Sequence, residues 1–152
     1  MAFRTLREGM RSGLVAAAAT AGVLIGLGSA HGAALRPLNS VAHILIGSRA
    51  YYMEGADLLV TPLALLTHTA SVMLWGVLLA LATGRLTGPR LYGAALVFAG
   101  LTWIVDFRIV PDRLRPGFES GLSPVEVSLV YIVLAVSLAW ALDRERRSAA
   151  AE

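Results

Sequence analysis

The sequence predicts an all-α fold: an integral membrane bundle of four transmembrane helices, with a short interfacial or re-entrant helix between the first and second spans. Four apolar stretches meet or approach the length of about 20 residues that a helix needs to cross a hydrocarbon core roughly 30 Å thick. Charged residues concentrate between these stretches and at the ends of the chain, where loops would meet water. The expected spans are residues 13–35, 58–83, 90–110 and 122–142.

The composition places the chain outside the soluble globular class, because 57% of its residues are hydrophobic and the mean hydropathy is +0.69. Its 152 residues suit a single membrane domain, residues 1–152. The absence of cysteine excludes disulfides, thiolate metal sites and iron–sulfur clusters. The high hydrophobicity makes the lipid bilayer the expected partner. The formal charge of +3 does not indicate a nucleic-acid partner, because arginines in loops set the orientation of a membrane protein.

Arginines are distributed unequally between the two ends of the predicted bundle. The two termini and the turn between the second and third spans hold eight arginines, whereas the opposite loops hold four. Because positively charged loops stay in the cytoplasm, both termini are expected there, in the inner membrane of a bacterium. The eight are Arg4, Arg7, Arg11, Arg85, Arg90, Arg144, Arg146 and Arg147.

The first span carries small residues at every fourth position, namely Ala18, Gly22, Gly26 and Ala30. Such a stripe lets another helix approach closely. Packing against the chain's own spans is the favoured interpretation, and contact with a second copy or another membrane protein is the alternative.

The first span also resembles a signal peptide with a cleavage site after its small residues, but its length of about 23 residues favours a retained helix.

The connection between the first two spans contains a short apolar run after Asn39, which is too short to cross a membrane. An interfacial or re-entrant helix over about residues 39–52 is expected, with Asn39 as its N-cap. The second span follows, and its Thr67, His68 and Ser71 are expected to face other helices rather than lipid.

The third span ends and the fourth span begins with charged residues. These residues are therefore expected at the same end of the bundle, beside the loop that joins the two spans. The third ends with Asp106 and Arg108, two residues apart and therefore on different helix faces. The fourth begins with Ser123 and Pro124, followed by Glu126 at the capping-box position.

All three histidines and both carboxylates within the spans lie in the outer half of the predicted bundle, whereas the inner half is apolar. The polar cluster expected there consists of Asn39, His43, His68, Asp106, Arg108 and Glu126. A carrier would need exchangeable polar groups reaching both sides of the membrane, so transport is the less favoured function.

His68 is expected to form a hydrogen bond to a neighbouring helix. His68 and His31 are the candidate cofactor ligands, but their depths do not match, so no haem or metal is predicted. For Asp106 three partners stay open: His68, Arg49 and Arg113. No nucleophile motif or phosphate-binding loop occurs, and no catalytic residue is predicted.

Three segments resemble a group of small, uncharacterised bacterial inner-membrane proteins. These are Leu38–His43, with its Asn-x-x-x-His pattern; Thr67–Ser71, which contains His-x-Ala-Ser; and Val105–Glu119, with an aspartate near the end of the third span. Some members of the group carry two adjacent histidines where this chain has Thr67 and His68. The resemblance implies a four-helix inner-membrane fold and brings no activity with it.

The sequence therefore favours a structural or interaction subunit without enzymatic activity, whose outer polar cluster holds helices and loops together. The alternative is a membrane protein that binds a cofactor, such as haem or a metal, or a small ligand at the outer face.

Overall fold

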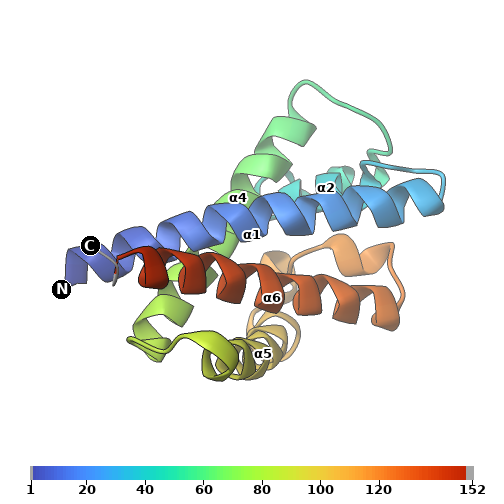
Figure 1. Cartoon of the computed structure of the whole chain (residues 1–152). Helices are drawn as coiled ribbons and strands as arrows, with labels where there is room; N and C mark the ends of the chain where they lie inside the picture. The colour runs from blue at the N-terminus through green and yellow to red at the C-terminus, as the bar shows by residue number, and fades with distance from the viewer. Residues whose placement is uncertain (1, 150–152) are drawn as a thin grey trace.

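The computed structural model describes residues 2–149, and within them 83% of the fold is helical with no strand, which confirms the predicted fold class. Within the described residues, four helices are long and apolar enough to span a membrane. The third of them is continued by a π-helical turn, η3. They are α1 (Ala2–Ala30), α4 (Val60–Thr83), α5 (Gly88–Ile104, continued by η3, Val105–Ile109) and α6 (Pro124–Ser148) (Figure 1).

Short helical turns form the two long connections. The first connection contains α2 (Arg36–Asn39), η1 (Ser40–Ala42), α3 (His43–Ile46) and η2 (Gly47–Tyr52), so the predicted short helix is a chain of four brief elements. The second contains η4 (Asp112–Leu114) and η5 (Phe118–Ser120). We call the end of the bundle that holds both connections the loop end, and the end that holds the termini and residues 84–87 the terminal end.

Two helices differ in length from the predicted spans. Helix α1 begins eleven positions earlier than residue 13, since Ala2 is its first residue, and it ends at Ala30, before a left-handed Gly32 (φ +77°). Helix α6 extends to Ser148, beyond residue 142. The additional turns carry charged residues, so each helix can continue into water beyond the hydrocarbon.

The closest helix contact is the crossing of α1 and α4, where glycines face each other. A Cβ atom on Gly13 would lie 2.4 Å from the Met73 Cα, and one on Gly76 would lie 2.5 Å from the Gly9 carbonyl oxygen. Glycine is required here because the two backbones leave no room for a side chain.

The small-residue stripe of Ala18, Gly22, Gly26 and Ala30 does not form this contact. All four residues are exposed, and neither Gly22 nor Gly26 has any heavy atom within 4 Å of a Cβ placed on it. The stripe therefore does not pack against the described spans of its own chain, and its contact with another protein stays a prediction.

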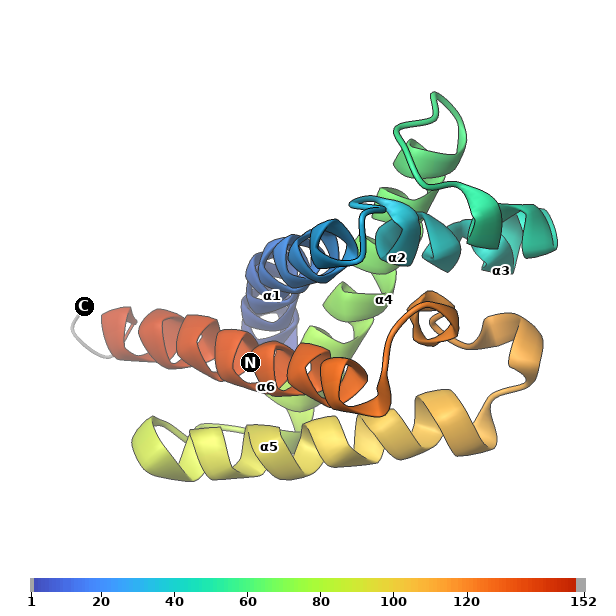
Figure 2. The same ribbon diagram turned by 90° about the vertical axis from the view of Figure 1, so that its right-hand side faces the viewer.

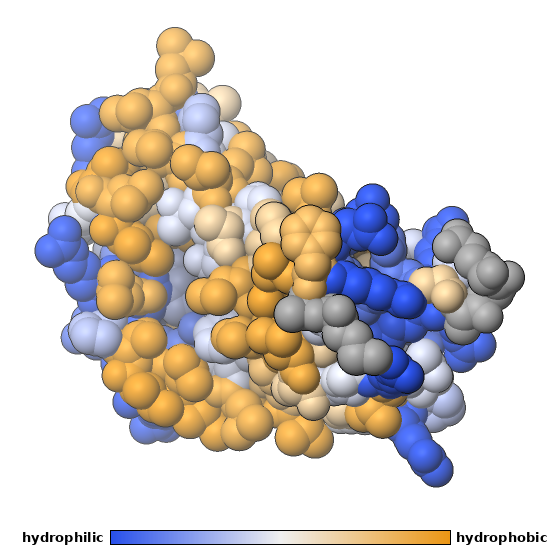
Figure 3. Space-filling view, turned by 90° about the vertical axis from the view of Figure 1, so that its left-hand side faces the viewer, coloured by the Kyte–Doolittle hydropathy of each residue, from blue (hydrophilic) through white to orange (hydrophobic). Residues whose placement is uncertain are grey.

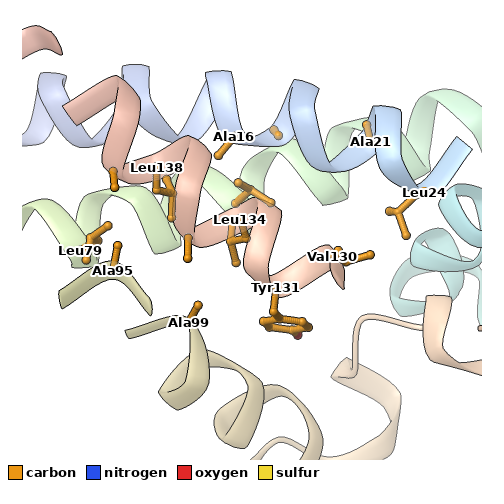
Figure 4. Close-up of a cluster of buried hydrophobic side chains, with 14 of the residues drawn as sticks. Ala16, Ala21, Leu24, Leu79, Ala95, Ala99, Val130, Tyr131, Leu134 and Leu138 are labelled. Carbon is orange, nitrogen blue, oxygen red and sulfur yellow. The ribbon is translucent and has the colours of Figure 1, made fainter. Parts of the chain in front are cut away.

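Helix α6 lies between α1 and α5 and supplies the centre of the core (Figure 4). Its Leu134 and Leu138 are nearly inaccessible to solvent, and the alanines Ala95 and Ala99 of α5 allow close packing against it. Figure 1 views α5 almost along its axis while α1 and α6 lie across the picture, so α5 is strongly inclined to the other two. Figure 2 shows α5 and α6 side by side.

Large apolar side chains cover much of the outside of the bundle. Leu66, Val97 and Leu101 are each more than half exposed. Figure 3 shows a broad apolar surface, with hydrophilic residues gathered beside the chain termini. A surface of this kind would aggregate in water and suits contact with lipid chains.

A buried ion pair joins three helices at the terminal end. The Arg146 guanidinium donates hydrogen bonds to the carbonyl oxygens of Ala80 (3.2 Å) and Leu86 (2.7 Å) and to Thr83 Oγ1 (3.2 Å). Its Nε lies 3.7 Å from Glu8 Oε2, and both side chains are less than a tenth exposed. Arg146 therefore binds the Ala80 carbonyl in the last turn of α4 and joins that turn to the segment that follows it, a role beyond the orientation signal predicted from the sequence.

The Gly13→Ala variant should be destabilised by about 1–3 kcal/mol, because its methyl group forces the α1 and α4 backbones apart. Thermal unfolding in detergent, followed by circular dichroism, measures the loss. Gly22→Ala is the matched control, since it adds the same methyl group to open space on the same helix. Equal melting temperatures for the two variants would contradict the proposed crossing contact.

The Arg146→Gln variant should lose about 3 kcal/mol of stability, since it removes the buried guanidinium that binds Ala80, Thr83 and Leu86 and leaves the Glu8 carboxylate with only the exposed Arg4 as its partner. Arg147→Gln, which removes an exposed arginine paired with Asp143, should cost less than about 1 kcal/mol. The double variant Glu8→Gln and Arg146→Gln should recover part of the loss, because the carboxylate that has lost its buried partner is then removed as well. No recovery in the double variant would mean that the ion pair itself contributes nothing.

Candidate functional site

A cavity of about 210 Å³ lies between α1, α4, α6 and the π-helical turn η3, toward the loop end. Its walls are mainly aliphatic and aromatic, with a few polar groups among them. The polar lining residues are Thr20, His68, Ser71, Asp106 and Tyr131. A mostly apolar hollow with a few hydrogen-bonding groups is the usual form of a small-molecule site.

Helical spacing places the α4 residues of the cavity on one face. His68, Val72 and Trp75 follow one another at intervals of four and three residues, and Ser71 lies beside them. From the opposite side, α6 contributes Tyr131.

The end of the third span is a π-helical turn. The Val110 amide donates to the carbonyl of Val105, five residues earlier, at 2.9 Å, and Pro111 then ends the helix. Asp106 lies in this wide turn and reaches the cavity. Turns of this type occur frequently at functional sites.

His68 bonds to α1 across the cavity wall. Its Nε2 lies 2.9 Å from Thr20 Oγ1, and that hydroxyl donates its own proton to the Ala16 carbonyl at 2.8 Å. Because the hydroxyl has only one proton, the imidazole carries its hydrogen on Nε2 and donates it to Thr20. His68 thus joins two helices, as the sequence predicts for it.

Asp106 bonds to a tyrosine of α6. Tyr131 donates its hydroxyl proton to Asp106 Oδ2 at 2.6 Å, and its ring packs between Phe107 and Phe118. Within residues 2–149 the second carboxylate oxygen, Oδ1, accepts no hydrogen bond. None of the three partners proposed from the sequence binds Asp106, because helix rotation brings Tyr131 to it instead.

His31 and Glu126 form a separate pair outside the cavity. Their Nε2 and Oε1 atoms lie 2.7 Å apart, and half of the His31 side chain is exposed. Glu126 also accepts from the Ser123 amide at 2.7 Å, which confirms the predicted capping box. His31 and His68 therefore do not converge on one cofactor position.

His43, in the first connection, is buried and contacts the second connection. Its Nδ1 lies 2.9 Å from the Ser40 carbonyl, and its ring stacks on Tyr51 with centroids 4.9 Å apart. Gly117, at φ +91°, approaches it so closely that a Cβ would lie 2.7 Å from Nδ1. Burial, followed by the negative charges of Glu119 and Asp112, raises the pKa of the Tyr51 phenol.

Asn39 organises the start of α4 rather than capping its own short helix. The fully buried amide donates to the carbonyls of Met53 (3.0 Å) and Gly55 (2.9 Å), and its oxygen accepts from the Thr61 hydroxyl at 2.9 Å. Each of the polar atoms of this side chain is thus satisfied by segments distant in sequence.

Asp57 supplies the cap that opens α4. Its Oδ1 accepts from the amides of Leu59 (2.8 Å) and Val60 (2.7 Å), while its own amide donates to Thr61 Oγ1 at 3.0 Å. These backbone hydrogen bonds, Val60 first, hold the pKa of the Asp57 carboxyl below its usual value. An aspartate three residues before the helix is the sequence signal that could have identified this cap.

Arg108 points away from the cavity. It is exposed, and its guanidinium carbon lies 6.0 Å from the centre of the Trp103 ring. Among the predicted cluster residues, only His68 and Asp106 therefore line one cavity. In the described part of the chain, no three histidine, aspartate or glutamate side chains gather closely enough to hold a metal ion.

Ser71, Trp75 and Tyr131 complete the candidate site, although none of the three is predicted from the sequence as a ligand-binding residue. Ser71 Oγ forms no hydrogen bond within residues 2–149, in contrast to Thr67, which bonds to the Leu63 carbonyl at 2.8 Å. The Trp75 ring packs edge-on against Phe98. The helical spacing of Ser71 and Trp75 from His68 is the signal that could have pointed to these two, whereas Tyr131 lies on another helix and has no such signal.

Comparison of the chain with protein-family models, with curated proteins and with solved structures finds no match. The resemblance to small bacterial inner-membrane proteins stays a prediction. Function is therefore inferred from the geometry of the cavity.

The Asn39→Asp variant should lose about 2 kcal/mol or more, because a carboxylate cannot donate to the two carbonyls that the amide binds. The effect should be strongest in residues 53–57, whose amides should exchange hydrogen faster than in the parent protein. Hydrogen exchange followed by peptide mass spectrometry measures this rate. Peptides from the contact between α5 and α6 serve as the internal reference, since their exchange should not change. Unchanged protection of residues 53–57 would exclude the anchoring role.

Proposed function

We propose that this chain is an integral protein of the bacterial cytoplasmic membrane that holds a small, mainly apolar ligand in the cavity lined by His68, Ser71 and Asp106. The observation that supports it is the cavity itself, in which a carboxylate oxygen and a serine hydroxyl are left without protein partners. Asp106 is half-buried and Ser71 is exposed, so both groups are accessible to a polar group on a ligand that enters the cavity.

The proposed orientation places both termini in the cytoplasm and the loop end outside. It is supported by the excess of eight arginines at the terminal end over four in the two loop-end connections. In this orientation the cavity lies nearer the outer side of the membrane.

The proposed ligand combines an apolar body with one polar group that both donates and accepts. A donor on the ligand would bind Asp106 Oδ1, and the Ser71 hydroxyl would complete the contact. The cavity, at about 210 Å³, is smaller than the roughly 300–1,000 Å³ of sites for drug-sized molecules. A small ring, or the head group of a lipid-soluble molecule, fits this volume.

An interaction subunit is the second candidate function. The exposed stripe of Ala18, Gly22, Gly26 and Ala30 favours it, because nothing within the described chain covers the two glycines. The two roles are compatible, since the stripe and the cavity occupy different parts of the molecule.

Small molecules that remain with the protein after extraction in a mild detergent should be identifiable by mass spectrometry. Ser71→Phe should remove the ligand by filling the cavity, whereas Ser29→Phe, the same change on α1 outside the cavity, should retain it. Asp106→Asn should weaken binding about tenfold or more, because a hydrogen bond to a charged acceptor is lost without a change of volume.

Three outcomes would contradict the proposal. These are equal retention by the Ser71→Phe and Ser29→Phe variants, the absence of any retained molecule in the parent protein, and a stoichiometric metal or haem absorption band in place of an organic ligand.

A further inference from the structure

Two adjoining cavities lie between α1 and α6, apart from the ligand cavity. One, of about 450 Å³, is at the terminal end and is lined by Arg7, Arg11 and Arg144. The other, of about 440 Å³, is apolar and extends toward Ile132. Both are lined by Val15 and Trp140, so they form one groove that is cationic at one end and apolar along the rest.

Helical spacing explains why the groove has this form. On α1 the positions 7, 11, 15 and 19 follow one another by four and change from arginine to apolar residues. On α6 the positions 132, 136, 140 and 144 are also four residues apart, and they change from apolar residues to arginine. Because the two helices run antiparallel, the arginines of both meet at the terminal end.

The arginines of the groove retain binding capacity. Arg4 and Arg147, which lie nearby, bind Glu8 and Asp143 at 2.8 Å each. By contrast, neither Arg7 nor Arg144 forms an ion pair within residues 2–149.

The third arginine of the groove has a weak partner. Arg11 lies 3.3 Å from Glu145, in a pair that is largely exposed. The cationic part of the groove therefore contains three guanidinium groups and one carboxylate.

We propose that this groove binds an anionic phospholipid, with its phosphate at Arg7, Arg11 and Arg144 and one acyl chain along Val15 and Trp140. Guanidinium groups suit phosphate because they present paired donors to its oxygens. Basic pockets between transmembrane helices are typical sites for anionic lipid head groups. The Arg144 guanidinium lies 5.6 Å from the Trp140 ring centre, and tryptophan favours the boundary between head groups and chains.

The apolar half of the groove distinguishes a phospholipid from free phosphate. Val136 and Trp140 are about half exposed. The groove that they line leads directly from the arginines to the apolar side chains between α1 and α6. A free phosphate ion would use only the cationic half and would leave this surface uncovered.

Native mass spectrometry of the full chain, released from micelles doped with defined lipids, tests the proposal. Phosphatidylglycerol should be retained in preference to phosphatidylcholine. The Arg7→Gln and Arg144→Gln double variant should bind phosphatidylglycerol about fivefold more weakly for each arginine removed. Arg85→Gln with Arg90→Gln is the matched control, since it removes two exposed arginines from the same end, outside the groove.

A second variant tests the apolar half. Val136→Trp should fill the groove and reduce lipid retention with all arginines in place. Equal retention of the two lipids, an equal loss in the control, or full retention by Val136→Trp would each overturn the proposal. Displacement of the lipid by millimolar inorganic phosphate would reassign the groove to a phosphate site.

Discussion

The close crossing of α1 and α4 determines the geometry of the candidate site. Gly9 and Gly13 meet Gly76 there, and the backbones are in contact without intervening side chains. Thr20 lies seven residues beyond Gly13 on α1, and His68 lies eight residues before Gly76 on α4. Because the helices are antiparallel, both positions are about two turns from the crossing, and the 2.9 Å bond between them depends on that approach.

Hydropathy and local patterns were sufficient for the fold but not for the contacts within it. The four long helices and the Ser123–Glu126 capping box are as predicted, since both depend on residues that are neighbours in sequence. The partner of Asp106 depends on the rotation of α6 about its axis, and span hydrophobicity carries no information about that rotation. Asn39 is similar, because its partners lie 14, 16 and 22 residues further along the chain.

The small residues of α1 show the same limit. The helix has two rows of them, and either could have packed against α4. The row with Gly9 and Gly13 does so, whereas the row with Gly22 and Gly26 faces outward. Which row is used follows from the fit of whole helix surfaces, including the cap that Arg146 provides at the end of α4.

The π-helical turn at Val105–Ile109 has a consequence for the second connection. The last turn of the third span is wider there than a regular helix turn, and the helix ends directly after it, where Val110 and Pro111 are extended. Leu114, Pro116 and Phe118 belong to the connection that follows, and all three line the cavity. The same turn thus brings a carboxylate to the hollow and begins the loop that gives it a roof.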